Sequence, residues 1–460
     1  MRRIAFLSPL PPDTSGIADY SAELVPALAA HCEIDLFTAD PGAVPEAFTS
    51  RFPVRSWDEF LAVDAGARYE SVIYQVGNSA EHHGTIYRTL LERPGIVALH
   101  EYMLHHLIRD LAVGGGRSAF VEEMRYAYGE TGRSMAPRLL TANNLPEMWT
   151  YPLFERIVDH AEALIVHSQA TRDRVLASRP ASRISLVHHH LSLGSVDGPD
   201  QAVREALQDQ YGIAREAMVI ASFGHLNSAK RLDVALRAFA RLRRSHPQCV
   251  YALVGQPSHA YAELDELLCG ELGEGVVTTG RVPLDTLLQF MANCDVAVNL
   301  RHPTGGETSG ACLRLLGLGR PVIVTEAGWF AEIPNDCCAH VAIDRDEEEM
   351  LLAVLTALVE QPELRARLGR NAARWAAEEH RIEDSAAGYA RAVEEAITHP
   401  AHPTTALPPL ARTPPGDMTS ALVAGISAAL GDVGLSELDP EPARSIARDL
   451  VDLEIDNVRG

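Results

Sequence analysis

Lysine is almost missing from this 460-residue chain. Its basic residues number 40, and only Lys230 among them is a lysine. A sequence that uses arginine wherever a cation is needed, yet keeps one lysine, suggests that a compact point charge is required at that position. Chance is the alternative explanation, and the lysine by itself does not decide between the two.

Long apolar runs and an excess of positive charge are also missing. No stretch approaches the roughly twenty apolar residues that span a bilayer. The start, MRRIAFLSPL, has a short apolar run interrupted by proline, which predicts a first strand and not a signal peptide. The net charge of −22 argues against nucleic acid and anionic membrane as partners. We therefore expect a soluble, cytoplasmic protein without a transmembrane segment.

The seven cysteines show no metal-ligand spacing. Only Cys337 and Cys338 are close in sequence, and adjacent cysteines rarely chelate a metal or form a disulfide. We expect buried free thiols in a reducing compartment.

Apolar runs of strand length alternate with helical patterns, which predicts parallel sheets with helices on both faces. Strands are expected at 4–7, 34–37, 72–76, 96–100, 164–167 and 184–188, and again at 219–223, 250–254, 276–279, 296–299, 322–325 and 340–343. Helical patterns include 18–30, 231–244, 261–269, 283–292, 362–379 and 383–397. The predicted fold is α/β, with two tandem Rossmann-like doubly wound domains and a cleft between them.

The composition divides the chain into five parts. Two Rossmann-like domains are expected at 1–205 and 206–380, followed by a helix at 381–398 that packs back towards the first domain. The segment 399–419 is rich in proline and predicts a semi-rigid linker. Residues 420–460 predict a small acidic helical tail, either a solvated appendage or a segment that docks onto the body or a partner.

Two loops of the first domain carry candidate site residues. In PLPPDTSGIADYS, Gly16 lies between a strand and a helix, where backbone N–H groups can approach an anion, although an ordinary turn explains the pattern as well. His100 ends a predicted parallel strand, so its ring is expected in the crevice. A zinc site made of His100, Glu101, His105 and His106 is the alternative, but no i, i+4 pair certain to share a face supports it.

Two loops of the second domain carry stronger signals. In FGHLNSAKRLDVALRAF, Lys230 stands at or just before a helix start, where the helix dipole already favours anions. A departing diphosphate needs such a positive field. In RHPTGGETSGACLRLLGLGRPVIVT, the backbone amides near Ser309 and Gly310 can cradle phosphate oxygens, and Glu307 can accept hydrogen bonds from sugar hydroxyls.

The ordered set of segments PPDTSGIADYS, LHEY, FGHLNSAKRLDVALRAF, TGRVPLDTLLQFMANCDVAVNL and GETSGACLRLLGLGRPVIV resembles glycosyltransferase family 4, whose members are retaining enzymes of the GT-B fold. The resemblance covers about residues 1–398 and is strongest over 218–345. It implies an acceptor-side first domain, a second domain that binds a nucleotide diphosphate-sugar, and no other cofactor.

The resemblance also implies roles for individual residues. His100 would contact the transferred sugar, Lys230 would bind the diphosphate, and Glu307 would hold sugar hydroxyls as the first glutamate of the family's E-x7-E motif. The remaining donor-binding residues implied are Gly16, His225, Arg231, Arg281, Val282, Thr308, Ser309, Gly310 and Arg314.

Two positions depart from the family pattern. Arg314 aligns with the second glutamate of E-x7-E, which holds the ribose in relatives. His225 replaces an arginine that helps to bind the diphosphate, so the resemblance predicts a weaker or pH-dependent clamp unless Arg231 or Arg314 compensates.

The predicted chemistry is a metal-independent front-face substitution that transfers a sugar to a glycan, polyol or natural product. The D-x-D string at Asp344–Asp346 is expected to be a charge cluster at a helix N-terminus. Residues 114–149, with Tyr126, Tyr128, Arg133 and Asn143, are expected to face the acceptor. The alternatives are a phosphorylase with pyridoxal phosphate on Lys230, a sugar-nucleotide epimerase and a non-catalytic scaffold.

Overall fold

The computed structural model describes residues 1–62, 68–115, 117–141, 146–258, 261 and 263–399. The expected tail at 420–460 and nearly all of the expected proline-rich linker lie outside these residues. The described residues belong to one compact unit. Within them, no helix is long and apolar enough to cross a membrane.

The first sheet has seven parallel strands, one more than expected. Its spatial order is β3 (Val54–Ser56), β2 (Cys32–Thr38), β1 (Arg2–Leu7), β4 (Ser71–Val76), β5 (Ile96–Leu99), β6 (Ala163–Val166) and β7 (Ile184–Leu186). The sequence analysis missed β3, because this edge strand is short and only half-buried and therefore lacks an apolar run.

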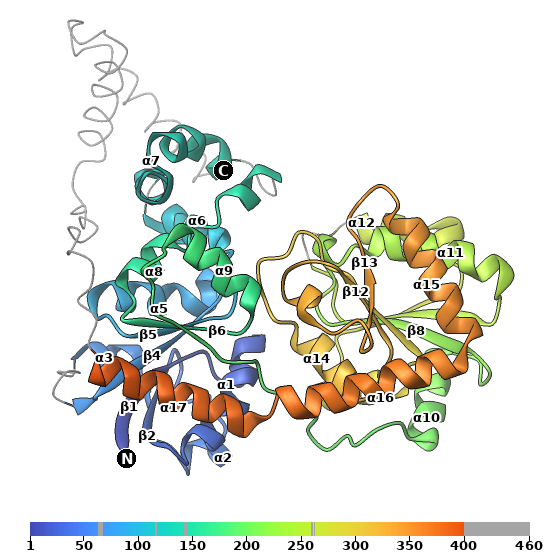
Figure 1. Cartoon of the computed structure of the whole chain (residues 1–460), viewed down its shortest axis with the longest axis horizontal. Helices are drawn as coiled ribbons and strands as arrows, with labels where there is room; N and C mark the ends of the chain where they lie inside the picture. Colours follow the sequence, from blue (N-terminus) through green and yellow to red (C-terminus); the bar gives the residue numbers. More distant parts are fainter. Residues whose placement is uncertain (63–67, 116, 142–145, 259–260, 262, 400–460) are drawn as a thin grey trace, which may run out of the picture. The chain divides into compact units, whose positions relative to one another are not determined.

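Helices accompany the first sheet (Figure 1). They are α1 (Gly16–Leu28), α2 (Glu46–Thr49), α3 (Trp57–Ala62), α5 (Ala80–Glu92), α6 (His105–Gly115), α7 (Arg117–Thr141), α8 (Glu155–His160) and α9 (Gln169–Ser178), with the 3-10 turn η1 (Pro146–Thr150). Successive residues of β1 enter different buried clusters, Ile4 on one face and Ala5 on the other. Both faces of the sheet are therefore buried, as parallel sheets require.

The second sheet has six parallel strands in the order β10 (Val276–Gly280), β9 (Cys249–Val254), β8 (Met218–Phe223), β11 (Val296–Asn299), β12 (Val322–Thr325) and β13 (Ala339–Val341). Its helices are α10 (Gln201–Tyr211), α11 (Leu232–Ser245), α12 (Glu263–Leu267), α13 (Leu284–Asn293), α14 (Gly310–Gly317), α15 (Glu347–Glu360) and α16 (Pro362–Glu379), with the 3-10 turns η2 (Ser228–Lys230), η3 (Gly270–Gly273) and η4 (Gly328–Glu332). The strand order reverses between β8 and β11. Such a switch point opens a crevice at the carboxyl ends of the strands, where doubly wound folds bind ligands.

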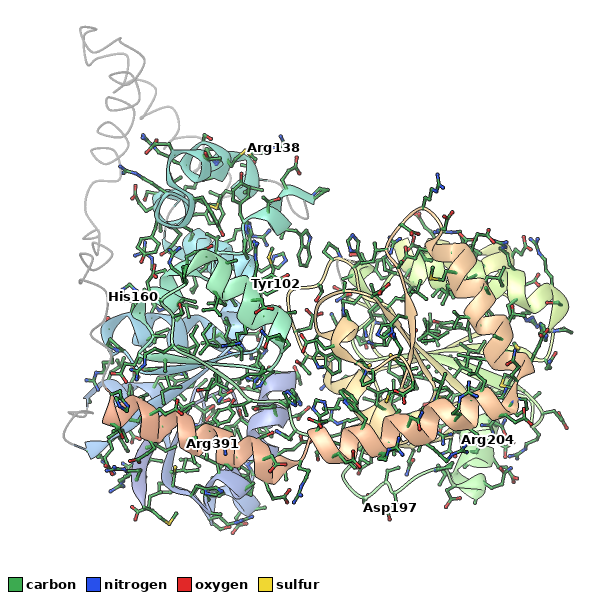
Figure 2. The ribbon with its side chains drawn as sticks, in the orientation of Figure 1. Tyr102, Arg138, His160, Asp197, Arg204 and Arg391 are labelled. Carbon is green, nitrogen blue, oxygen red and sulfur yellow. The ribbon has the colours of Figure 1, made fainter. Side chains whose placement is uncertain are left out.

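The expected domain boundary at 205/206 falls inside the helix α10. The Asp200 side chain caps its first turn by accepting from the N–H of Ala202, and Gly212 ends it with a φ of 68°. The Arg204 side chain, labelled in Figure 2, pairs with Asp295 at the start of β11 at 2.8 Å. This ion pair attaches α10 to the second sheet.

The last described helix, α17 (Ile382–Thr398), packs against α1 and against β4 to β7 of the first sheet (Figure 1). The Tyr389 side chain is fully buried there, and its hydroxyl accepts a hydrogen bond from the Tyr20 hydroxyl at 3.1 Å. The chain therefore completes the core of its first sheet with a helix that follows the second sheet in sequence.

The crossing of α14 and α16 leads to a stability prediction. A Cβ at Gly369 of α16 would lie 2.1 Å from the Gly319 carbonyl oxygen, which is backbone and cannot move aside cheaply. We expect Gly369→Ala to lower the free energy of unfolding in urea by about 1–3 kcal/mol through overpacking. In an open helical position, replacing glycine with alanine would add roughly 1 kcal/mol.

The Gly16→Ala variant is the matched control, since a Cβ at this first residue of α1 meets nothing within 4 Å. It should be as stable as the parent protein or more stable by up to about 1 kcal/mol. An unchanged or raised urea midpoint for Gly369→Ala would contradict the close helix crossing.

Candidate active site

Lys230 lies at the switch point of the second sheet, at the end of η2. Its side chain is 7% exposed, and its Nζ donates to the Phe223 carbonyl oxygen at the end of β8 at 2.5 Å. Burial and, to a smaller extent, the charge of Arg301 lower the pKa of Lys230 to about 7, while Glu307 opposes the shift. The only lysine of the chain is therefore held near its titration point, where an arriving anion would favour its charged form.

Arg301 is a second cation of the site that the sequence analysis did not identify. It comes two residues after the end of β11, and its Nε lies 3.0 Å from the Glu307 Oε1. Polar residues at the carboxyl end of a parallel strand are expected in the crevice, and Arg301 meets this condition as His100 does. The motif RHPTGGETSG, which begins with Arg301, carries this signal in the sequence.

Glu307 is held by its own loop. Its Oε2 accepts from the Gly305 N–H at 2.8 Å and from the Thr304 hydroxyl at 3.1 Å. Together with the ion pair to Arg301, these bonds engage both carboxylate oxygens. The predicted sugar-binding carboxylate is therefore pre-positioned beside Lys230 and Arg301.

The loop that carries Glu307 is bound by the first domain. The Gly305 carbonyl oxygen accepts from the backbone N–H groups of Tyr102 and Met103 at 2.8 and 3.1 Å. The Thr171 hydroxyl of α9 donates to the Gly306 carbonyl oxygen at 2.8 Å. A Cβ at Gly306 would lie 2.2 Å from the ring of Tyr102, which is labelled in Figure 2. The glycines of this loop thus permit close approach between the two domains.

Glu101 lies on the first-domain side of this contact. Its Oε1 accepts from the Asn78 N–H at 3.0 Å. Burial and, to a smaller extent, the charge of Glu307 raise the pKa of Glu101 to about 8. The sequence analysis considered Glu101 only as a metal ligand. The structure instead places it with Glu307 in one electrostatic cluster.

The helix α14 begins directly after the loop that carries Glu307. The Ser309 hydroxyl caps the helix by accepting from the Cys312 N–H at 3.2 Å, and the Thr308 Oγ1 is buried without a hydrogen-bond partner among the described residues. The position of a Cβ at Gly310 lies 3.8 Å from the Arg314 Nη1 and 4.0 Å from the His189 Nε2. The side chains of Arg314 and His189 therefore lie beside the first residue of α14.

The two arginines expected to compensate for His225 are both paired with carboxylates. The Arg314 Nη2 pairs with Glu23 of α1 at 2.9 Å, and its Nε donates to the Ser192 carbonyl oxygen. Arg231 pairs with the buried Glu347 at the start of α15. The compensation by Arg231 or Arg314 stays a prediction, and Arg301 is a further cation whose charge acts on Lys230.

A hollow of about 580 Å³ lies between the loop after β1 and the start of α13. Its lining residues are Pro11, Pro12, Asp13, Thr14, Asp19, Arg281, Val282, Pro283, Leu284 and Leu287. Arg281 and Val282 thus face the loop that precedes Gly16. His225 is exposed in the loop after β8, next to Gly224.

His100 directly follows β5, and its Nε2 donates to the Gln75 Oε1 at 2.7 Å. The Tyr20 ring packs edge-on at 4.8 Å, and the His167 ring lies 4.9 Å away. Burial lowers the pKa of His100 well below its usual range, with smaller contributions from neighbouring histidines. The ring is therefore neutral at physiological pH, with Nδ1 left as a hydrogen-bond acceptor.

The alternative zinc cluster does not assemble around His100. The His105 Nδ1 donates to the Tyr151 carbonyl oxygen, and the ring packs against Phe120. Across the described part of the chain, no group of three or more histidine, cysteine, aspartate or glutamate side chains is placed to hold a metal ion. The D-x-D prediction is confirmed, since Asp346 is the N-cap residue of α15.

The tyrosines of the expected acceptor region are engaged with α8. The Tyr126 hydroxyl donates to Asp159 at 2.7 Å, and the Tyr128 hydroxyl donates to Glu155 at 3.1 Å. Arg133 pairs with Glu130 on its own helix, while Asn143 lies outside the described residues. These contacts hold Tyr126 and Tyr128 against α8, and the expectation that this region faces the acceptor stays a prediction.

Comparison with known proteins places this site in context. Residues 203–375 match the family model described as "Glycosyl transferases group 1". The chain is similar to the D-inositol 3-phosphate glycosyltransferase of Nocardioides sp., with 26% identity over 233 residues, 47% of this chain and 50% of the relative. It thus spans half the length of that relative. The enzyme of the same name from Streptomyces avermitilis is 26% identical over 403 residues, 82% of this chain and 84% of the relative.

A similar arrangement is found in the crystal structure of Anabaena HepE in complex with UDP and glucose. The TM-score is 0.58 with 16% identity, over 86% of this chain and 100% of that chain. Identity this low shows the fold alone. The two parallel sheets have the GT-B architecture, which confirms the predicted fold class. The family model matches part of the second domain, and both curated relatives are glycosyltransferases by name.

The single lysine makes the charge balance of the site directly measurable. In protein labelled with ¹³C at the lysine ε-carbon, one side-chain signal should titrate with a midpoint of about 7. Arg301→Gln should raise this midpoint by removing a like charge, and Glu307→Gln should lower it by removing an opposite charge. The distant Arg244→Gln variant should leave it unchanged. A midpoint near 10.5, or equal shifts of one sign in both site variants, would contradict the cluster.

Proposed function

We propose that the chain is a retaining, metal-independent glycosyltransferase that moves a sugar from a nucleotide diphosphate-sugar to an acceptor hydroxyl. The carrying observation is the convergence of Lys230, Arg301 and the α14 N-terminus at the switch point of the second sheet, beside the carboxylate of Glu307. Two cations and a helix N-terminus favour a diphosphate, and a carboxylate favours sugar hydroxyls. The free state of all seven cysteines supports a cytoplasmic location.

The proposed reaction is a front-face substitution at the anomeric carbon. The bond from this carbon to the β-phosphate oxygen breaks, and a bond to the acceptor oxygen forms on the same face. The acceptor proton passes to the departing phosphate oxygen, so the leaving group itself is the base. Lys230, Arg301 and the loop amides would stabilise the charge that develops on the diphosphate, which lowers the barrier to its departure.

The other site residues would position the two substrates. Glu307 would accept hydrogen bonds from hydroxyls of the transferred sugar, and the neutral His100 would contact the sugar through Nδ1. Arg281 and Val282 would lie against the nucleotide base, and the loop that begins α1 at Gly16 would adjoin the acceptor. The names of the curated relatives favour a phosphorylated cyclitol as the first acceptor to test.

Donor binding should depend on Lys230. In a thermal-shift panel of UDP, GDP, ADP and dTDP, one nucleotide at a hundred times its dissociation constant should add about 2.7 kcal/mol of stability. Lys230→Ala should lose that effect, and kcat should fall about 10²–10³-fold, as when one donor is removed from an oxyanion site. Arg244→Gln, a change to an exposed surface arginine, is the control and should match the parent. Binding without turnover would favour a scaffold, and consumption of donor without acceptor would favour an epimerase.

The stereochemical outcome and the metal requirement form a separate test. Proton NMR of the product formed in the first turnovers should show the anomeric configuration of the donor. The rate should be unchanged after treatment with EDTA, because Lys230 and Arg301 would supply the charge that a metal provides elsewhere. An inverted product would overturn the front-face mechanism. A rate abolished by EDTA and restored by Mg²⁺ would overturn metal independence.

A further inference from the structure

Glu101 and Glu307 are carboxylates from different domains that approach the same point. The position of a Cβ at Gly305 lies 3.1 Å from the Glu101 Oε2 and 3.4 Å from the Glu307 Oε2. A side chain at residue 305 would occupy this point, and glycine leaves it free. The carboxyl groups of Glu101 and Glu307 therefore lie on either side of residue 305.

The position of Glu101 is fixed by the backbone of the first domain. Its Oε1 accepts from the Asn78 N–H at 3.0 Å, and the Asn78 Oδ1 in turn accepts from the Leu107 N–H of α6 at 3.0 Å. The Glu101 side chain is thus anchored by one oxygen, and no hydrogen bond to its Oε2 is found among the described residues. This asymmetry is typical of a group that presents one atom to a ligand.

The charged groups around Glu101 favour one shared proton. From the second domain, Glu307 and Arg301 face it, and from its own domain Asn78 offers a backbone N–H. Burial and the Glu307 charge outweigh the other two and raise the pKa of Glu101 to about 8. Near pH 7 the carboxyl group of Glu101 is mostly protonated and can donate a hydrogen bond, while ionised Glu307 accepts.

We propose that Glu101 is a further sugar-binding residue, which contacts a hydroxyl of the bound donor sugar beside Glu307. A protonated carboxyl and a carboxylate side by side offer one donor and several acceptors, and neighbouring sugar hydroxyls, each both donor and acceptor, match that pattern. The contact would require both domains, since Glu101 follows a strand of the first sheet and Glu307 follows a strand of the second. This inference rests on the proposed function, because the ligand is the sugar of a nucleotide donor.

The test compares a nucleotide with its sugar conjugate. Calorimetry would measure UDP and UDP-glucose, or the corresponding pair for the nucleotide selected in the thermal-shift panel, with the parent protein, Glu101→Gln and Glu101→Ala. UDP affinity should be equal in all three proteins. UDP-glucose affinity should fall about tenfold in Glu101→Ala, a loss typical of one hydrogen bond in a buried site, and less than threefold in Glu101→Gln, which keeps a donor.

The pH profile provides the second readout. The parent kcat/KM should fall in two steps as pH rises, through about 7 as Lys230 loses its charge and through about 8 as Glu101 loses its proton. Glu101→Gln cannot lose the second proton and should keep the step at about 7 but lack the step at about 8. Glu162→Gln is the matched control. Glu162 is a half-buried glutamate before β6, at the amino ends of the strands, and burial raises its pKa as well. It should keep the parent profile.

Each outcome bears on the proposal. Equal losses of UDP and UDP-glucose affinity in Glu101→Ala would show a structural role and overturn the sugar contact. A step at about pH 8 that is retained in Glu101→Gln, or full UDP-glucose affinity in Glu101→Ala, would overturn it as well. A parent protein that binds no nucleotide would overturn the proposed function, and the inference with it. A parent that binds UDP normally while the variants match it would overturn the inference alone.

Discussion

The hydrogen bonds from the Tyr102 and Met103 N–H groups to the Gly305 carbonyl oxygen hold the site together. They bind a loop of one Rossmann-like domain to the strand-end loop of the other, at 2.8 and 3.1 Å. Backbone groups cannot be exchanged by mutation, so this contact depends on shape, and the glycine at 306 allows the Tyr102 ring to approach. The orientation of Glu307 follows from it, because the same loop supplies the groups that bind its carboxylate.

Electrostatics then couple the groups that this contact brings together. Glu307 favours the charged form of Lys230 and Arg301 favours the charged form of Glu101, but neither outweighs the effect of burial. Burial moves the pKa of Lys230 down and that of Glu101 up, so both lie near neutral pH. Such groups change protonation readily when a charged ligand arrives.

Part of this arrangement could be predicted from the sequence and part could not. The apolar runs identified all the strands of both sheets except β3, whose three residues form a half-buried edge. The single lysine pointed to the switch point of the second sheet, because strand-end position and helix-start pattern are local properties. Arg301 had the same local signal and was overlooked. Glu101 had no such signal, since its partner Glu307 lies in the other half of the chain.

The sequence by itself determined the parallel α/β architecture and the loops that meet at the strand ends, because both follow from periodicity within short segments. Only the tertiary structure decided which side chains within those loops act together. Arg231 and Arg314 stand in the predicted motifs, yet their charges are committed to Glu347 and Glu23 in distant helices. Ion pairing depends on distance in space and on burial, and neither quantity is encoded in the spacing of residues along a single segment.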